Sequence, residues 1–469
     1  MSSPADAASL QSALAAEGTV SQAPSLLHRV LVLPIKFFWG MVFCQGLAGS
    51  ILVVGWTYRL AQRSAFKFWC SRAEPPRTGP AFSQFLAEHE TTSPQAHWPN
   101  WFAQQNLRHQ VRLNPELGAS SRLLRLLPAL GHSLWLNFWI GLRGTATTWV
   151  VTLPAAILWW FGWYDGWNNS FNKGYEQAIV GPLLSILGIA WFITAMFYVP
   201  VAQARQAVTG DWRSFFQFRL IRKLARDRWV YCVLLAGLYT LLSLPLSVLK
   251  TSPMFWMHNS TALATLTTPQ VLALLKGYYL WCALVVLPGF VLVHLVAARI
   301  YASGLLSLLQ AGELAATELA LAEREVLDRL GLLAVRPRAE RHVFVRFIAW
   351  SGTGIGRAVG KVALVLIWFS FVAQIYITQF LNYHSGLGWM NQTLVQLPWF
   401  RYLPTSVRNP LTDVFWALLI LIVAQTFSLL YRRLLVGRRA NCWGVGPFPV
   451  PSRLKVCATV AAHPASRSD

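Results

Sequence analysis

Long apolar stretches constrain this chain more than any other feature of its sequence. About 20 consecutive apolar residues in a helix cross the hydrocarbon layer of a membrane. Seven stretches have about this length, at residues 37–58, 145–163, 177–199, 229–249, 271–298, 362–383 and 411–431. Only 12% of the residues are charged, whereas a soluble domain carries about 25%. The sequence therefore predicts an all-α, polytopic integral membrane helix bundle with about seven spans.

Basic residues are distributed unevenly between the segments that connect these stretches. Thirty-three of the 40 Lys and Arg residues lie in 59–143, 200–228, 299–361 and 432–469. Loops rich in Lys and Arg stay on the cytoplasmic side, so we expect a protein of the cytoplasmic membrane with a cytoplasmic C-terminus. The net charge of +22 then reflects topology and attraction to anionic lipids on that side, and we expect no nucleic-acid partner.

This topology divides the chain into nine consecutive segments. They are a disordered tail (1–29), a first membrane helix (30–58), a cytoplasmic loop ending in an interfacial helix (59–143), a hairpin of spans two and three (144–199), a basic amphipathic cytoplasmic segment (200–228), a hairpin of spans four and five (229–298), a cytoplasmic amphipathic helix with a glycine stripe (299–361), a hairpin of spans six and seven (362–431) and a basic cytoplasmic tail (432–469). Within them, we expect residues 300–331 to extend the fifth span as one long helix and residues 384–410 to form an outer loop.

The glycine stripe lies in SGTGIGRAVGK, residues 351–361. A Walker A phosphate-binding loop would need glycine where Ile355 stands, so the sequence excludes that kind of site. Gly352, Gly356 and Gly360 recur every four residues and would share one side of a helix. Such small-residue stripes let helices approach closely in a membrane. We expect a helix-packing face that leads into the sixth span, and the alternative is a flexible hinge.

Few polar side chains fall within the predicted spans. None of the 18 acidic residues lies at the middle of a span, although ion-coupled pumps need ionisable groups there. The possible intramembrane polar contacts are Gln45, Lys276, His294, Gln374 and Gln425. An amide within lipid needs a partner on another helix, and Lys276 can extend its charged end to the interface. The alternative is that these side chains line a pathway or an anion site.

A basic amphipathic pattern marks residues 200–228. Arg213, Arg219, Arg222, Lys223 and Arg226 alternate there with phenylalanine, leucine and isoleucine. A helix with this pattern lies flat on the inner leaflet, with its apolar side in the lipid and its charges near anionic headgroups. The alternative is that the basic side docks on an acidic partner surface.

Sequence patterns of membrane enzymes are missing. The chain holds no GxSxG nucleophile elbow and no HExxH metal pattern. Its six cysteines form no CxxC pair and no zinc spacing. We therefore expect no catalytic residue, no cofactor and no metal site.

The leading hypothesis is a non-enzymatic accessory, scaffold or assembly subunit of a membrane complex, with other membrane-protein subunits as partners. It rests on the missing intramembrane charges, on the glycine stripe and on cytoplasmic helices without catalytic residues. The alternative is a transporter or channel for a neutral or lipid-like substrate, because such a substrate needs no buried carboxylate.

Overall fold

The computed structural model describes residues 26–92, 119–162, 180–259, 265–333, 343–381, 391–398 and 425. Every regular element within these ranges is a helix, so the all-α prediction is confirmed. The elements are α2 (Leu26–Phe43), α3 (Leu47–Arg72), α4 (Pro80–Thr92), α6 (Ala119–Phe161), α8 (Val180–Met196), α9 (Val199–Thr209), η3 (Trp212–Phe216), α10 (Phe218–Asp227), α11 (Trp229–Asn259), α13 (Thr268–Gln310), η4 (Ala316–Glu318), α14 (Leu321–Arg329) and α15 (Val343–Leu381).

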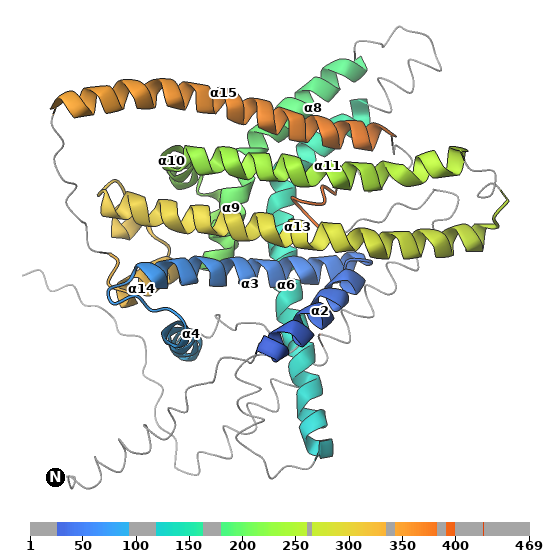
Figure 1. Cartoon of the computed structure of the whole chain (residues 1–469), viewed down its shortest axis with the longest axis horizontal. Helices are drawn as coiled ribbons and strands as arrows, with labels where there is room; N and C mark the ends of the chain where they lie inside the picture. The colour runs from blue at the N-terminus through green and yellow to red at the C-terminus, as the bar shows by residue number, and fades with distance from the viewer. Residues whose placement is uncertain are drawn as a thin grey trace, which may run out of the picture.

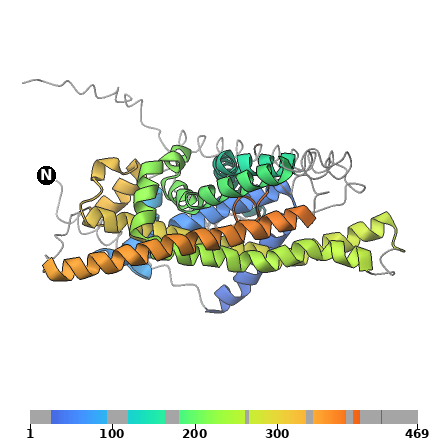
Figure 2. The ribbon, with the colours of Figure 1, turned by 90° about the horizontal axis from the view of Figure 1, so that it is seen from above.

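Four long helices lie side by side and form a row. α3 packs on α13, α13 on α11, and α11 on α15, and Figure 1 shows them in this order with roughly aligned axes. α6 crosses the row and packs on α3 and on α8. Seen from above, α6 and α8 lie on one side of α11, α13 and α15 (Figure 2). The bundle thus consists of an aligned layer and a crossing layer.

Two glycines allow α6 to cross α3 at backbone contact. A Cβ atom added at Gly55 of α3 would lie 1.7 Å from the backbone oxygen of Asn137. A Cβ atom added at Gly141 of α6 would lie 1.8 Å from the backbone oxygen of Ile51. No side chain fits at such distances, so the two helices can meet in this way only because both positions lack one.

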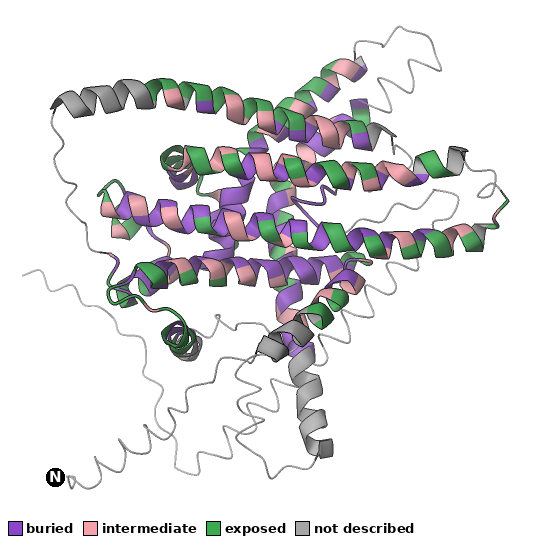
Figure 3. Ribbon diagram, in the orientation of Figure 1, coloured by how far each residue is buried: buried purple, intermediate pink, exposed green. Residues whose placement is uncertain are grey.

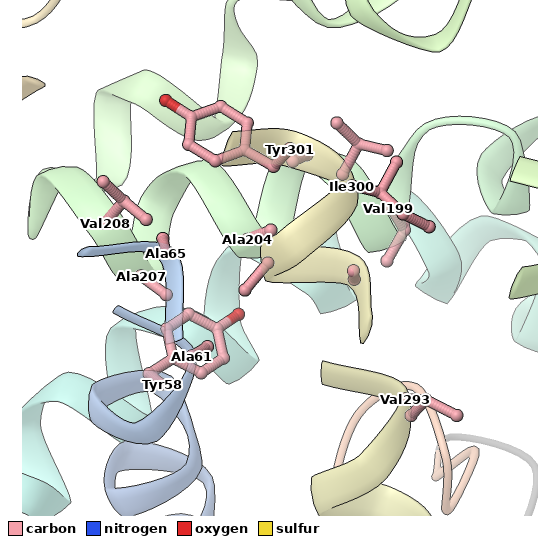
Figure 4. Close-up of a cluster of buried hydrophobic side chains, with 14 of the residues drawn as sticks. Tyr58, Ala61, Ala65, Val199, Ala204, Ala207, Val208, Val293, Ile300 and Tyr301 are labelled. Atoms are coloured by element: carbon pink, nitrogen blue, oxygen red, sulfur yellow. The ribbon is translucent and has the colours of Figure 1, made fainter. Parts of the chain in front are cut away.

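Small residues also surround α9 in the middle of the bundle. Every residue of α9 is buried, between α3, α13 and α6. Figure 4 shows Ala61 and Ala65 of α3 beside Ala204 and Ala207 of α9. Close packing of this kind fills a protein interior to the density of an organic crystal. α9 is therefore fixed by packing contacts with α3, α13 and α6.

Three helices are long and apolar enough to cross a membrane. They are Trp229–Pro253 in α11, Pro269–Gln310 in α13 and Gly354–Thr378 in α15. They overlap the predicted fourth, fifth and sixth spans, 229–249, 271–298 and 362–383. α8 and α9 meet at a bend of 42° and form a fourth candidate only if the bent pair is one span. The chain is thus a helical membrane protein with three or four candidate spans among the described residues.

The predicted number of about seven spans is not confirmed. Residues 30–58 form two helices, because α2 ends at Phe43 and α3 begins at Leu47, after the extended backbone of Gly46. Residues 122–163 do not divide into an interfacial helix and a span, since α6 runs unbroken from 119 to 161. Neither α3 nor α6 is among the described helices that are long and apolar enough to cross a membrane. The seventh predicted span, 411–431, lies outside the described residues apart from position 425.

Three helices of the row, α11, α13 and α15, carry large exposed apolar side chains. Leu241 on α11 is 63% exposed, Trp281 on α13 is 68% exposed and Ile355 on α15 is 70% exposed. Figure 3 shows the contrast between exposed α15 and buried α9 and α3. Water-soluble proteins rarely expose contiguous apolar surfaces, whereas lipid covers them without cost. These faces therefore fit a hydrocarbon environment.

The segment after α13 differs from the predicted long helix over 300–331. α13 ends at Gln310, and Gly312 adopts a left-handed backbone with φ +69°. The chain then forms η4 and returns as α14, which packs on α9. A left-handed glycine is a common way to end a helix, and Glu323 of α14 is buried. The turn is thus explained by an internal contact that periodicity alone does not reveal.

α10 also differs from the expectation of a helix lying on lipid. Its apolar side chains Leu220, Ile221 and Leu224 are buried, and α10 packs on α13. These three side chains are therefore covered by protein, whereas Phe218 at the start of α10 is 56% exposed. This leaves the basic side of α10 exposed at the end of the bundle where α4 and α14 also lie (Figure 1).

Candidate functional site

A non-helical segment lies inside the helix bundle. Residues 391–398, NQTLVQLP, form a short turn in which the Val395 and Gln396 amides donate to the Gln392 carbonyl oxygen at 2.7 and 2.8 Å. All eight residues are buried, so the prediction of an outer loop over 384–410 is wrong for this part. The segment is the short orange trace between α11 and α13 in Figure 1.

The segment reaches the middle of two candidate spans. A Cβ atom added at Gly289 would lie 3.7 Å from Leu394 and 3.7 Å from Leu242. Gly289 is at the centre of α13, and Leu242 is near the centre of the candidate span in α11. The sequence pattern does not predict this position, because NQTLVQLP is too short and too mixed in polarity to indicate a segment buried between helices.

Hydrogen bonds join residues 391–398 to α6 and α9. Gln203 of α9 donates from Nε2 to the Val395 carbonyl oxygen at 2.7 Å and to Thr148 Oγ1 at 2.9 Å. Gln396 accepts from the Trp149 indole and donates to the Thr152 hydroxyl. The inserted backbone is therefore held by amide and hydroxyl groups rather than by apolar packing alone.

α9 adds a second polar contact to the same face of α6. Gln206, one helical turn after Gln203, accepts from the Thr147 hydroxyl at 2.7 Å. Residues three apart share a helix face, which explains why both amides face α6. We call this group the buried polar layer; it consists of Thr147, Thr148 and Thr152 of α6, Gln203 and Gln206 of α9, and residues 391–398.

A pocket adjoins the buried polar layer between α11, α15 and residues 391–398. It encloses about 350 Å³, counting the part that is open to the outside. Its lining residues are Ser243, Leu246, Ser247 and Lys250 of α11, Phe371, Ile375 and Thr378 of α15, and Gln392, Thr393 and Leu394. Mixed apolar walls with a few polar groups are typical of small-molecule sites.

Among the described residues of this lining, Lys250 is the charged one. It lies inside the candidate span Trp229–Pro253 and is only 7% exposed. The predicted fourth span, 229–249, ends just before Lys250, so the sequence did not place this residue within the span. The signal that could have identified it is the apolar run that resumes with Met254, Phe255 and Trp256.

The predicted intramembrane polar residues occupy different places. Gln374 accepts a hydrogen bond from the Ser243 hydroxyl, which joins α15 to α11 beside the pocket. Gln45 donates from Nε2 to the carbonyl oxygens of Met41, at 3.1 Å, and Tyr279, at 3.2 Å. Lys276 and Gln425 are exposed. Of these four residues, only Gln374 lies next to the pocket.

His294 is buried between α13 and α3, away from the pocket lining. Its Nδ1 lies 2.8 Å from the Phe290 carbonyl oxygen, and its ring centroid is 6.1 Å from that of Tyr58. This arrangement fits a histidine that packs between helices.

The stretch that carries the predicted glycine stripe is helical and lies within α15. A Cβ atom added at Gly360 would lie 2.0 Å from the Trp229 ring of α11, and one at Gly356 would lie 4.0 Å from it. The surroundings of Gly352 lie outside what the structure describes. Gly360 thus meets a helix of the same chain, whereas the role of the stripe in binding a partner stays a prediction.

The predicted basic residues form one exposed group. Arg213 lies on η3, and Arg219, Arg222, Lys223 and Arg226 lie on α10, all exposed. Lys223 is 3.8 Å from Glu318, and both side chains are about half exposed. An ion pair of this kind contributes little to stability, so the group remains available to an external charge.

A second buried polar cluster links α9 to α14. Arg205 Nε lies 3.0 Å from Glu323 Oε1, and both side chains are fully buried. Glu323 also accepts from the Tyr301 hydroxyl and, at 2.8 Å, from the Ala320 amide, while Arg205 donates to Gln217. This pair could not be predicted from the sequence pattern, because its two residues are 118 positions apart.

Comparison with known proteins finds a family match that includes the α6 and α9 residues of the buried polar layer but not residues 391–398. A family model described as "Protein of unknown function (DUF4013)" matches residues 128–251. The match covers most of α6 and all of α8, α9 and α10, and ends one residue after Lys250. No curated protein and no solved structure matches the chain.

Proposed function

We propose that this chain is a non-enzymatic, multi-pass transporter or channel that admits a small polar solute to the buried polar layer. The observation that carries the proposal is the non-helical segment 391–398 at the middle of two candidate spans. Within a membrane, non-helical backbone is tolerated only where protein buries it or where it lines a cavity.

The bend between α8 and α9 supports the same function. Transporters place their binding sites where discontinuous helices meet near the midplane. Here α9 follows a 42° bend and binds residues 391–398 through Gln203. Gln203 Oε1 is buried and accepts no hydrogen bond from the described residues, and a buried amide oxygen normally has a partner. A solute or water can supply that donor.

The proposed topology follows the charges of the connecting segments. We place the chain in the cytoplasmic membrane with a cytoplasmic C-terminus and with anionic lipids on that side. α10, α4 and α14 lie at one end of the row, and α10 carries four of the exposed basic residues. This end fits the cytoplasmic side under the positive-inside rule.

Cysteine accessibility tests the proposed pathway without knowledge of the substrate. Thr393→Cys lies in the pocket lining, and Leu241→Cys lies on the exposed apolar side of α11. A charged, water-soluble thiol reagent needs a thiolate, and a thiolate does not form in lipid. We expect Thr393→Cys to react well above the background of the unmodified chain, and Leu241→Cys to stay at that background. If Thr393→Cys is as inert as Leu241→Cys, the pathway is disproved.

A scaffold or accessory subunit is the second candidate function. It is favoured by the exposed basic group on η3 and α10, because Leu220, Ile221 and Leu224 of α10 are buried in the protein. Such a surface fits an acidic partner. Native mass spectrometry of gently extracted protein tests it. We expect the mass of a complex with a partner protein, and we expect it to disappear when Arg219, Arg222 and Arg226 are all changed to Glu. The control Arg324→Glu should keep the complex. A complex that survives the triple change would contradict this role.

A further inference from the structure

The exposed basic group of η3 and α10 lies next to the start of a candidate span. α10 ends at Asp227, and the candidate span in α11 begins at Trp229, so one residue separates them. Val230 and Tyr231, in the first turn of that span, are 47% and 50% exposed. With α11 as a span, lipid meets it from this turn onward, and α10 lies at the surface of the bilayer.

The orientation of α10 also fits a position at that surface. Figure 1 views α10 along its axis, whereas α11 runs across the picture, and Figure 2 shows the same crossing from above. The buried Leu220, Ile221 and Leu224 attach α10 to the protein. A helix that lies crosswise at the end of a span runs along the membrane surface, where its long basic side chains can reach lipid headgroups.

Two large aromatic side chains are exposed among the basic residues. Trp212 is 47% exposed, and the Arg213 guanidinium lies 5.7 Å from the centre of its ring. Phe218 is 56% exposed and lies four residues before Arg222, on the same helix face. Aromatic rings that contact acyl chains beside polar headgroups are typical of the membrane interface.

The charge of this surface is not cancelled by the carboxylates beside it. Asp211 accepts from the Arg213 amide at 3.0 Å and caps η3, while Asp227 lies 3.2 Å from Arg228. The exposed basic group therefore keeps an excess of positive charge. Clusters of about four to eight Lys and Arg residues next to a span are typical of binding to anionic lipids.

We infer that Trp212, Phe218 and the exposed basic group together bind the phosphate groups of anionic phospholipids at the membrane surface. The basic side chains pair with phosphate oxygens, and the two rings contact the acyl chains beside them. This inference goes beyond the proposed function, because it depends on α11 as a span and not on the buried polar layer.

Lipid is favoured over the acidic partner of the second candidate function by the position of the surface. A surface one residue before a span meets headgroups in every copy of the protein. An acidic protein accounts for the charges, but not for their place directly beside the bilayer.

Native mass spectrometry of the full chain measures the preference between two lipids. The protein is extracted into detergent and mixed with equal amounts of anionic phosphatidylglycerol and zwitterionic phosphatidylcholine. We expect phosphatidylglycerol to be retained preferentially. Each basic residue near an anionic surface strengthens binding about fivefold, so Arg219→Gln, Arg222→Gln and Arg226→Gln combined should lower that preference at least tenfold.

A matched variant removes the same charge elsewhere. Lys67→Gln, Arg72→Gln and Arg324→Gln combined change exposed residues of α3 and α14 and should leave the preference unchanged. An equal loss in this control would show an effect of net charge alone and would overturn the inference. An unchanged preference in the variant with three glutamines on α10 would overturn it as well.

Two further variants separate charge from folding and from the rings. Arg219→Lys, Arg222→Lys and Arg226→Lys combined keep the charge and should retain most of the preference, whereas a loss as large as with glutamine would assign the effect to altered structure. Trp212→Ser with Phe218→Ser keeps every charge and should reduce the retention of both lipids. Unaltered retention would remove the rings from the proposed surface.

The same spectra distinguish lipid from an acidic partner. A partner protein that is lost with the three glutamines on α10, without any preference between the lipids, would assign the surface to the second candidate function and refute lipid binding. The proposed pathway fails separately: an inert Thr393→Cys refutes the pathway and leaves the lipid preference, whereas a reactive Thr393→Cys without that preference keeps the pathway and refutes the lipid surface.

Discussion

At the scale of single residues, Arg205 and Glu323 show why one buried charge requires another. Each side chain is fully buried, and removing one partner leaves the other charge uncompensated. We expect Glu323→Gln to lower the free energy of unfolding by about 3–5 kcal/mol, measured by denaturant unfolding in detergent. The double change Arg205→Met with Glu323→Leu should recover most of that loss, because an apolar pair of similar volume fits the same place.

The exposed pair between Lys223 and Glu318 is the matched control. Its atoms are 3.8 Å apart and both side chains are about half exposed, so water and salt screen the attraction. Glu318→Gln should change the free energy of unfolding by less than about 1 kcal/mol. Equal losses for Glu318→Gln and Glu323→Gln would contradict the assignment of a structural role to the buried pair.

At the scale of helices, the crossing of α3 and α6 depends on Gly55 and Gly141. A Cβ atom at Gly55 would overlap the backbone oxygen of Asn137, and a backbone cannot rotate away as a side chain can. Gly55→Ala should therefore destabilise the protein by about 1–3 kcal/mol, measured as a lower melting temperature. Gly237→Ala, where nothing lies within 4 Å, should be neutral or slightly stabilising. A harmless Gly55→Ala would show that the helices do not meet at this distance.

The helix α4 is docked through His89, which makes its attachment sensitive to pH. His89 lies between the rings of Phe66 and Phe85. Burial, and then the charge of Arg329, lower the pKa of His89 from 6.5 to about 4. His89 therefore binds a proton more readily in the unfolded state than in the folded state. The contribution of neutral His89 to stability is present above pH 6.5 and is lost as the pH falls towards 4. That loss amounts to about 3 kcal/mol.

Hydrogen exchange of residues 80–92 measures this effect. We expect protection of α4 to fall between pH 6.5 and pH 4 after correction for the intrinsic exchange rate. His89→Leu removes the titrating group and should flatten the profile in that window. A profile that keeps its slope in His89→Leu would assign the pH dependence to another group.

The helices also show where sequence reasoning succeeds and where it stops. The fourth, fifth and sixth spans were predictable, because each apolar run is long enough to be explained by lipid alone. Glu323 and residues 391–398 were not, since their burial depends on partners more than 100 residues away, Arg205 and Gln203. Gln374 was identified as a contact between helices, but Lys250 was missed because it follows an apolar run instead of interrupting one.

At the scale of the whole molecule, α13 is too long for the hydrocarbon layer to cover all of it. A helix of 43 residues extends about 65 Å at 1.5 Å per residue, whereas the hydrocarbon layer is about 30 Å thick. Part of α13 must therefore project beyond the lipid. The projecting part fits the end that packs against α10 and α14, because Glu323 pairs there with Arg205 and Arg228 donates to the Ser303 carbonyl oxygen at 3.0 Å.

Labelling of the two ends of α13 tests this topology. Thr265 precedes the helix and Ala311 follows it, and both are exposed. With an impermeant maleimide on intact cells, we expect Thr265→Cys to be labelled and Ala311→Cys to be labelled only after the membrane is opened. The opposite pattern would reverse the proposed orientation. Labelling of both positions in intact cells would show that α13 does not cross the membrane. The pathway through residues 391–398 would then lose its basis, because it requires α13 to be a span.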